Sequence, residues 1–319
     1  MALAFVFPGQ GSQAPGMGRD LAEAFPVARE VFQEVDDALK QKLSTLMFEG
    51  QAIDITLTSN AQPALMAVSV AVVRVLEKEG GFDLASRVAL VAGHSLGEYS
   101  ALTAARAFDL ATAARLLRLR GDAMQAATPP GTGAMAALLG ADTAQALAIC
   151  EAAKIDPETE QAEVLEIAND NGGGQIVISG AAGAVERAIA TAPGLGVRRA
   201  LPLPVSAPFH CALMAPAADA MAEALDGATI RAPVVPVVAN VSAAKATDPA
   251  EIRRLLVQQV TATVRWRECV AAMAAMGCDR FVEVGTGKVL TGLMKRNAPE
   301  AAASAIGTPA DVEAFLKTL

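Results

Sequence analysis

A serine between two glycines is the first candidate for chemistry in this chain. Residues 93–97 are G-H-S-L-G and fit the pattern G-x-S-x-G, in which the glycines allow a tight turn and the serine sits on an exposed corner after a strand. The flanks agree, because residues 88–92 are a short apolar run and residues 98–105 are good helix formers. The pattern predicts that Ser95 is a nucleophile and that the N–H of Leu96 faces a developing oxyanion. An ordinary strand–helix turn is the alternative that this local pattern leaves open.

A nucleophilic serine needs a neighbouring group that takes its proton, and histidine is the usual one. The chain has two, His94 and His210. Adjacent side chains at a strand end point to opposite sides, so His94 is poorly placed to serve Ser95, and we expect it to pack or form hydrogen bonds beneath the turn. His210 is therefore favoured as the base. No Asp or Glu follows a strand at an obvious place for a third member, which leaves a backbone carbonyl as the group that orients the imidazole.

Arg120 is the next candidate, and its sequence context allows two interpretations. It lies in a helical pattern with Arg115 and Arg118, which we expect to be solvated. A guanidinium also presents a fork that fits a carboxylate through two hydrogen bonds. The sequence around Arg120 favours neither a solvated surface position nor a carboxylate-binding one.

The loop at residues 9–14 formally matches the dinucleotide fingerprint G-x-G-x-x-A. No helix opens directly after it, since Pro15 and Gly16 follow, so the match is discounted. We expect a loop whose backbone N–H groups face a ligand. A non-catalytic nucleotide-binding protein is the alternative function that depends on this loop.

Strand-like and helical segments alternate along most of the chain, which predicts an α/β fold with a mostly parallel, helix-covered sheet. Between residues 130 and 200 the order becomes β-α-β-β-α-β, that of a ferredoxin-like unit. We therefore predict a large hydrolase-like α/β domain from residues 1–129 and 201–319, and an inserted small ferredoxin-like domain from residues 130–200. The outer part includes expected helices at 26–46 and 62–78, the second with Pro63 in its first turn, and an expected strand at 234–241.

Composition narrows the class of protein. The 319 residues are 53% hydrophobic and 19% charged, with a net charge of −8, which argues against a nucleic-acid partner. No apolar run approaches about 20 residues, so no membrane span is expected. The four cysteines are scattered without C-x-x-C spacing, which indicates free thiols in a reducing compartment and no metal site. We expect a cytoplasmic monomer.

Several motifs then combine into a family pattern. In chain order they are residues 7–13 (F-P-G-Q-G-S-Q), residues 93–99 (G-H-S-L-G-E-Y), Arg120-Gly121 with Met124, Phe209-His210, and residues 283–290 (E-V-G-T-G-K-V-L). Together they resemble malonyl-CoA:acyl carrier protein transacylases, the acyltransferase family that loads fatty-acid synthesis. The resemblance covers essentially the whole chain, including the inserted domain.

The resemblance implies a role for each member of a reaction centre. Ser95 would be the acylated nucleophile and His210 its general base and acid. Gln10 and Leu96 would supply the two backbone N–H groups of an oxyanion hole. Arg120 would bind the free carboxylate of a malonyl group.

Two further residues gain a role in the same way. The backbone carbonyl of Gln259 would orient His210, which implies a Ser–His dyad without an acid. Phe209 would leave little room at the α-carbon of the acyl group, which favours malonyl over methylmalonyl.

The expected reaction is malonyl transfer from malonyl-CoA to the phosphopantetheine thiol of acyl carrier protein, through a malonyl-serine intermediate and with ping-pong kinetics. No metal or redox cofactor is implied. Carrier proteins are acidic, so docking is expected at basic residues, with Arg198, Arg199, Lys288, Lys295 and Arg296 as candidates. A serine thioesterase or other hydrolase that uses the same Ser95 and His210 is the alternative.

Overall fold

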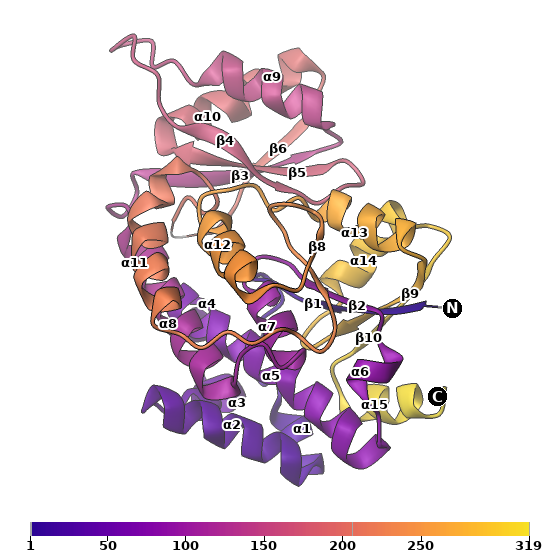
Figure 1. The fold of residues 1–319 in the computed structure, drawn as a ribbon. Coiled ribbons are helices and arrows are strands. Elements are labelled where there is room, and N and C mark those ends of the chain that lie inside the picture. Colours follow the sequence, from indigo (N-terminus) through magenta and orange to yellow (C-terminus); the bar gives the residue numbers. More distant parts are fainter. Residues whose placement is uncertain (1, 206, 319) are drawn as a thin grey trace.

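The computed structural model describes residues 2–205 and 207–318. Figure 1 shows a larger lower part, with a twisted sheet and most of the helices, and a smaller upper part in which a second sheet lies beneath two helices. The N- and C-terminal segments both lie in the larger part, on the same side of the molecule (Figure 1).

The larger sheet has six strands in the order β10-β9-β1-β2-β7-β8, and every neighbouring pair is parallel except β7–β8. The strands are β1 (Ala2–Phe7), β2 (Leu90–Gly93), β7 (Val237–Val238), β8 (Lys245–Ala246), β9 (Cys278–Val284) and β10 (Ala302–Ile306). The predicted α/β class with a mostly parallel sheet is confirmed. In the register, Phe7 pairs with Gly93, so the loops that follow β1 and β2 leave the same edge of the sheet.

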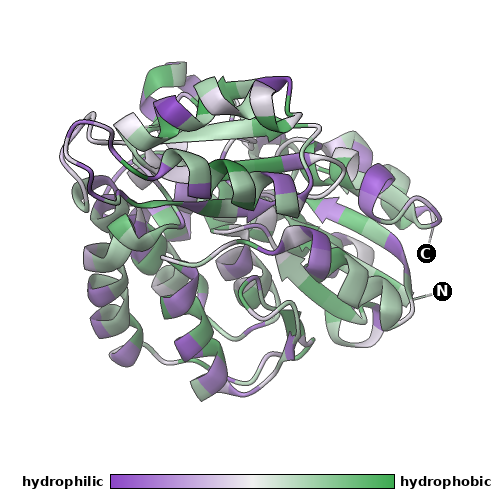
Figure 2. Cartoon of the chain, turned by 90° about the horizontal axis from the view of Figure 1, so that it is seen from above, coloured by the Kyte–Doolittle hydropathy of each residue, from purple (hydrophilic) through white to green (hydrophobic). Residues whose placement is uncertain are grey.

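Helices cover both faces of this sheet. Side chains alternate along β1: Phe5 and Phe7 join the apolar core on one face, and Ala4 and Val6 join the core on the other. In Figure 2 the strands are mainly hydrophobic, while hydrophilic residues mark the outer helices. The helices of this part are α1 (Arg19–Ala24), α2 (Pro26–Leu39), α3 (Leu43–Glu49), α4 (Ala52–Thr56), α5 (Thr58–Gly80), α6 (Leu84–Arg87), α7 (Gly97–Ala104), α8 (Leu110–Ala126), α11 (Ala215–Asp226), α12 (Pro249–Gln259), α13 (Trp266–Ala275), α14 (Val289–Asn297) and α15 (Pro309–Leu316), with a short 3-10 turn, η2 (Ala212–Met214).

Helix α5 is the long central helix of the larger part. It is long and apolar enough to cross a membrane, but 89% of its apolar window is buried inside the protein, as in a core helix. The helix begins at Thr58, so Pro63 lies inside it and the prediction that Pro63 occupies the first turn is wrong. The extra turn is stabilised by a contact with the preceding helix, in which the Asn60 side chain donates to the backbone oxygen of Asp54 at 2.9 Å.

Other predicted boundaries also shift where the chain turns. The helix expected at 26–46 is two helices, because Lys40 adopts a left-handed φ of 50° and ends α2. The Asp36 carboxylate accepts from the backbone N–H of Ser44 at 2.8 Å, which fixes the start of the next helix. The strand expected at 234–241 pairs over two residues only. Strand β10 and helix α15 were not predicted.

The smaller part is a four-stranded antiparallel sheet in the order β4-β5-β3-β6 with the element order β-α-β-β-α-β. This is the predicted ferredoxin-like arrangement. The sheet spans 133–202, whereas the domain boundaries at 129/130 and 200/201 stay a prediction. Its elements are β3 (Gly133–Leu139), α9 (Thr143–Ala153), β4 (Leu165–Asp170), β5 (Gln175–Ala181), α10 (Ala182–Thr191), a 3-10 turn η1 (Ala192–Leu195) and β6 (Arg199–Pro202).

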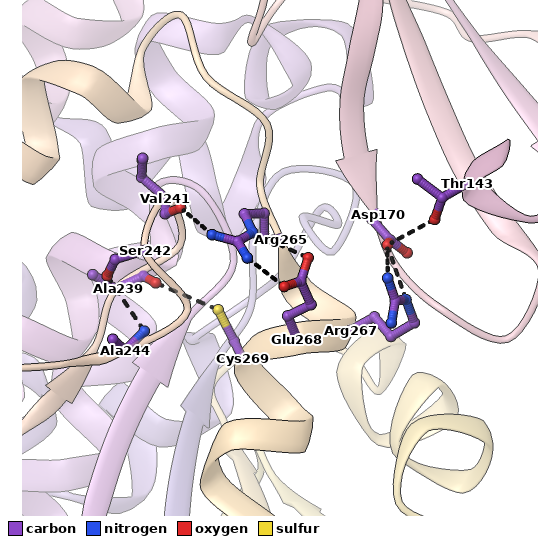
Figure 3. A network of polar contacts seen from close by, with 10 residues as sticks. All are labelled: Thr143, Asp170, Ala239, Val241, Ser242, Ala244, Arg265, Arg267, Glu268 and Cys269. Carbon is purple, nitrogen blue, oxygen red and sulfur yellow. Dashed lines mark hydrogen bonds and ion pairs between the residues drawn. The ribbon is translucent and has the colours of Figure 1, made fainter. Parts of the chain in front are cut away.

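Strand β4 attaches the smaller part to the larger one. The backbone N–H of Asp170 donates to Val264 at 3.0 Å, and Val264 in turn donates to Ala168 at 2.9 Å. Figure 3 shows the Asp170 carboxylate facing the guanidinium of Arg267, which lies on helix α13. Arg267 Nη2 is 2.7 Å from Asp170 Oδ2. The smaller sheet is therefore joined to the larger part through the segment before α13 and through α13 itself.

Candidate active site

The backbone at Ser95 has the shape of a nucleophile elbow. Ser95 has a φ of 53°, which a residue with a side chain adopts only under constraint. A Cβ at Gly93 would meet the backbone of Gly97 at 1.9 Å, and one at Gly97 would meet the Phe7 oxygen at 2.3 Å. Both glycines of the motif are required by this close approach between β1, β2 and α7.

The structure brings Ser95, His210 and Gln259 into one chain of hydrogen bonds. Ser95 Oγ lies 2.8 Å from His210 Nε2, and His210 Nδ1 lies 2.8 Å from the backbone oxygen of Gln259. A carbonyl oxygen only accepts, so Nδ1 carries the proton and Nε2 presents its lone pair to the serine. Burial, followed by the positive charge of Arg120, lowers the pKa of His210 to about 3, so the imidazole is neutral near pH 7. His210 also has a left-handed φ, of 59°.

Two free backbone N–H groups lie beside this pair. Gln10 is in the loop after β1 and Leu96 caps α7, and both line the same cavity as Ser95. Within residues 2–205 and 207–318, neither N–H has an acceptor. The N–H of Ser95 is engaged, because it donates to Asn240 Oδ1 at 2.8 Å. The N–H groups of Gln10 and Leu96 are therefore available to an acceptor in the cavity beside Ser95.

Arg120 is buried beside the serine rather than solvated. Its side chain is 1% exposed, and Nη2 lies 3.2 Å from Ser95 Oγ. Nη1 donates to Gln62 Oε1 at 2.8 Å and Nη2 donates to Gln259 Oε1 at 3.0 Å. No carboxylate in the described part of the chain forms an ion pair with Arg120. A buried cation held by neutral oxygens is suited to receive an anion from a ligand.

These groups open onto a cavity of about 390 Å³ between the two sheets. Phe209 forms part of its wall next to His210. His94 also lines it, and its Nε2 lies 2.8 Å from Asn171 Oδ1 on the smaller part. An amide oxygen accepts, so His94 is a donor to Asn171 and is turned away from the proton of Ser95.

Gln259 and the basic residues lie outside the cavity lining. Gln259 is fully buried, and its backbone oxygen reaches the site only through the hydrogen bond from His210 Nδ1. All five basic residues are exposed: Arg198, Arg199, Lys288, Lys295 and Arg296. Lys288 directly precedes Val289, which lines the cavity, so one of these cations is near the entrance.

Three polar residues at this site were not found from the sequence. Gln62 holds Arg120, Asn240 holds Ser95, and the Glu98 carboxylate accepts from the Asn240 N–H at 2.9 Å. All three side chains are buried. Asn240 directly follows the apolar run 234–239, which indicates that it is buried with a partner but does not show which group the partner is.

The fold and this geometry define an α/β enzyme with an activated serine at a strand end. The sequence profile of the acyl transferase domain matches residues 4–314. The chain is 47% identical over 314 residues to the malonyl CoA-acyl carrier protein transacylase of Escherichia coli strain K12, with 98% of each chain covered. It is 46% identical over 319 residues to the protein of that name in Bacillus subtilis strain 168, covering 99% of this chain and 97% of the other.

Solved structures agree. The acyl-carrier-protein-S-malonyltransferase of Bartonella henselae superposes with a TM-score of 0.95 at 55% identity, covering 100% of this chain and 99% of the other. A malonyl-transacylase in complex with a type II polyketide acyl-carrier protein gives 0.94 at 42% identity, with 100% of each covered. The chain belongs to the acyl transferase family, and the resemblance to its malonyl-CoA:acyl carrier protein transacylases is confirmed.

Proposed function

We propose that this enzyme transfers a malonyl group from malonyl-CoA to the phosphopantetheine thiol of an acyl carrier protein, and so supplies fatty-acid synthesis. The relatives of that name support the reaction. The observation that carries it is the buried Arg120, a cation 3.2 Å from Ser95 Oγ that has no carboxylate within ion-pair distance in the described chain. A serine enzyme for neutral acyl groups has no use for such a charge.

The first half-reaction acylates Ser95. With the malonyl carboxylate on Arg120, Ser95 Oγ attacks the thioester carbon while its proton passes to His210 Nε2. The N–H groups of Gln10 and Leu96 stabilise the tetrahedral oxyanion, and each such donor is worth roughly 10²–10³ in rate. The carbon–sulfur bond then breaks, and the CoA sulfur leaves with the proton from His210.

The second half-reaction reverses these roles. The carrier-protein thiol gives its proton to His210 Nε2 and attacks the ester carbon of malonyl-Ser95. The ester bond breaks, and Ser95 Oγ takes the proton back. The backbone oxygen of Gln259 keeps the imidazole oriented through both halves, so no acidic third member is needed.

Selectivity and setting complete the proposal. Phe209 limits space beside His210 and so favours an unbranched α-carbon. The steps use only protein groups and substrate, so we propose no metal or redox cofactor. We propose a monomer in a reducing, cytoplasmic setting, and the four free, buried cysteines support the reducing setting. We propose that the acidic carrier protein docks on the basic residues Arg198, Arg199, Lys288, Lys295 and Arg296, and charge reversal there should slow transfer but not acylation by malonyl-CoA.

The decisive experiment measures intact mass after brief incubation with malonyl-CoA and no acceptor. The expected result is one stable malonyl adduct, absent in Ser95→Ala, which addition of phosphopantetheinyl carrier protein then removes. Steady release of CoA without an adduct would instead identify a hydrolase. Neither an adduct nor CoA release would refute the substrate assignment.

A further inference from the structure

Asn240 is a buried residue that the reaction scheme does not use. It follows β7, is fully buried and does not line the cavity. Its carboxamide makes two hydrogen bonds to the elbow: Oδ1 accepts from the Ser95 N–H at 2.8 Å, and Nδ2 donates to the Gly93 oxygen at 2.7 Å. One side chain therefore fixes the backbone on both sides of His94.

The elbow needs such a restraint. Ser95 is held at a φ of 53°, a conformation that persists in a residue with a side chain only where the surroundings impose it. The backbone oxygen of Ser95 is restrained as well, since Gln259 Nε2 donates to it at 3.0 Å. Both polar backbone groups of the nucleophile are thus bound by side chains, one from the turn after β7 and one from α12.

Asn240 is itself anchored on every side. Its N–H donates to Glu98 Oε2 at 2.9 Å, and Glu98 lies on the helix that the elbow starts. The backbone N–H of Arg265 donates to the backbone oxygen of Asn240 at 3.2 Å. Figure 3 shows the next support, in which the Arg265 side chain donates to the Val241 oxygen at 3.0 Å and the Cys269 thiol faces the Ala239 oxygen. The restraint on Ser95 therefore rests on a fixed base.

We propose that Asn240 is a positioning residue that holds the Ser95 backbone in its reactive conformation and, by engaging the Ser95 N–H, assigns the oxyanion to Gln10 and Leu96. It touches neither substrate nor cavity, and it acts through the elbow. The inference rests on the proposed role of Ser95 as nucleophile.

The amide is the side chain that this position requires. It must accept from an N–H and donate to a C=O at the same time, which a carboxamide does and an ionised carboxylate cannot do. Aspartate at 240 would place a second acceptor against the Gly93 oxygen and a second carboxyl beside Glu98. Alanine would leave both backbone groups unpaired and buried.

The test compares Asn240→Ala and Asn240→Asp with the matched control Asn60→Ala. Asn60 is also a buried asparagine outside the cavity lining, and its side chain makes two hydrogen bonds, to Asp54 and from Arg118. Unlike Asn240, it has no hydrogen bond to the elbow at residues 93–97. Two rates are measured on the folded fraction: single-turnover acylation by malonyl-CoA, and labelling of Ser95 by a fluorophosphonate. Malonyl-CoA binding is measured in the Ser95→Ala background.

Both Asn240 variants are expected to lose roughly 10²-fold or more in the maximal acylation rate, as displacement of a reacting atom commonly costs. The half-saturating malonyl-CoA concentration should change by less than about threefold, because Asn240 makes no direct hydrogen bond to Arg120 or Gln62. Fluorophosphonate labelling should slow in parallel, and Asn60→Ala should match the wild type in both rates. Binding to Ser95→Ala should not change when Asn240→Ala is added.

Either folded Asn240 variant with both rates within about threefold of Asn60→Ala would overturn the proposal. An Asn240 variant that weakens malonyl-CoA binding as much as it slows acylation would also overturn it, because that is general damage. If Asn240→Ala does not fold, the near-isosteric Asn240→Asp decides. The fluorophosphonate rates test this inference separately from the proposed function. If malonyl-CoA is not the substrate, labelling of Ser95 should still be slower in the Asn240 variants than in Asn60→Ala.

Discussion

The two sheets line the cavity in different ways, one with the loops that follow its strands and the other with a sheet face. The loops that follow the parallel strands contribute Gln10 after β1 and Ser95 after β2, and Asn240 after β7 holds the Ser95 backbone from outside the cavity lining. The antiparallel sheet contributes one of its faces, with Met135 and Ala137 of β3 among the lining residues. Parallel strands all end at one edge, so their loops converge, whereas neighbouring antiparallel strands end at opposite edges.

This difference gives the two sheets separate tasks: the parallel side supplies the reacting groups, and the antiparallel side limits the shape of what can bind. Polar groups from several parallel strands meet at one point and can form a reaction centre. A sheet face offers alternate side chains at fixed spacing, which suits a wall that limits what enters. We therefore expect substitutions on the parallel side to change the rate of bond making, and substitutions on the antiparallel side to change binding or stability.

The largest effect is expected at His210, on the reacting side of the comparison. His210→Ala removes the proton acceptor of Ser95 and should lower the acylation rate by roughly 10²–10⁴-fold. His94→Ala is the matched control, because His94 lines the same cavity but contacts Asn171 of the smaller part. It should change the rate by less than about tenfold. Quenched-flow acylation by malonyl-CoA measures both, and equal losses would break the comparison.

The next effect is selectivity at Arg120. Hydrogen bonds to charged groups are worth about 1.5–3 kcal/mol each, so Arg120→Ala should lower kcat/KM for malonyl-CoA by roughly 10²-fold or more. Acetyl-CoA has no carboxylate, so its kcat/KM should fall much less. Arg118→Ala, two residues away on the same helix, is the control and should preserve the ratio of the two substrates. An unchanged ratio in Arg120→Ala would show that the guanidinium does not bind the substrate carboxylate.

These same residues show which parts of the site could be predicted from the sequence. The Ser95 elbow is local, because seven residues contain its strand end, turn and helix start, and its shape was predictable. His210 followed from elimination between two histidines, and Gln259 came from family resemblance. Asn240 and Gln62 could not be predicted, because their value depends on which oxygen or N–H the folded chain brings within 3 Å.

The fold shows the same division. Alternating strands and helices predicted the parallel sheet, and the order β-α-β-β-α-β predicted the inserted one. The start of α5 and the break after Leu39 depend on tertiary contacts of Asn60 and Asp36, so periodicity alone placed them wrongly. Strand β10 (A-A-S-A-I) is rich in alanine, which gives little strand signal.

A smaller effect is expected from the buried carboxyl of Glu98, on the supporting layer of the parallel side. Burial raises its pKa to about 7, from an ordinary 4.5. The folded state therefore holds this proton more tightly than the unfolded state, and that stability is present below pH 4.5 and is lost as the pH rises through 7. Glutamine does not titrate, so the Tm of Glu98→Gln minus that of the wild type should increase between pH 5.5 and pH 8.

The matched control for this titration is Glu268→Gln. Hydrogen bonding to Arg265 lowers the pKa of Glu268 below its ordinary 4.5, so its contribution should stay constant over the same interval. Thermal melts at several pH values in one buffer system measure both differences. A flat difference for Glu98→Gln would show that Glu98 keeps one protonation state across this interval.

The smallest effect is expected where the antiparallel side is attached. Arg267→Ala removes the ion pair with Asp170, but Arg267 is half-exposed and Asp170 Oδ1 still accepts from the Gly172 N–H at 3.1 Å. After screening by solvent, the loss in the free energy of unfolding should be about 1 kcal/mol. The maximal acylation rate should stay within about twofold, because no group that touches the thioester moves. If Arg267→Ala instead lowered that rate tenfold at unchanged malonyl-CoA binding, the antiparallel sheet would be part of the reacting geometry and the division between chemistry and shape would fail.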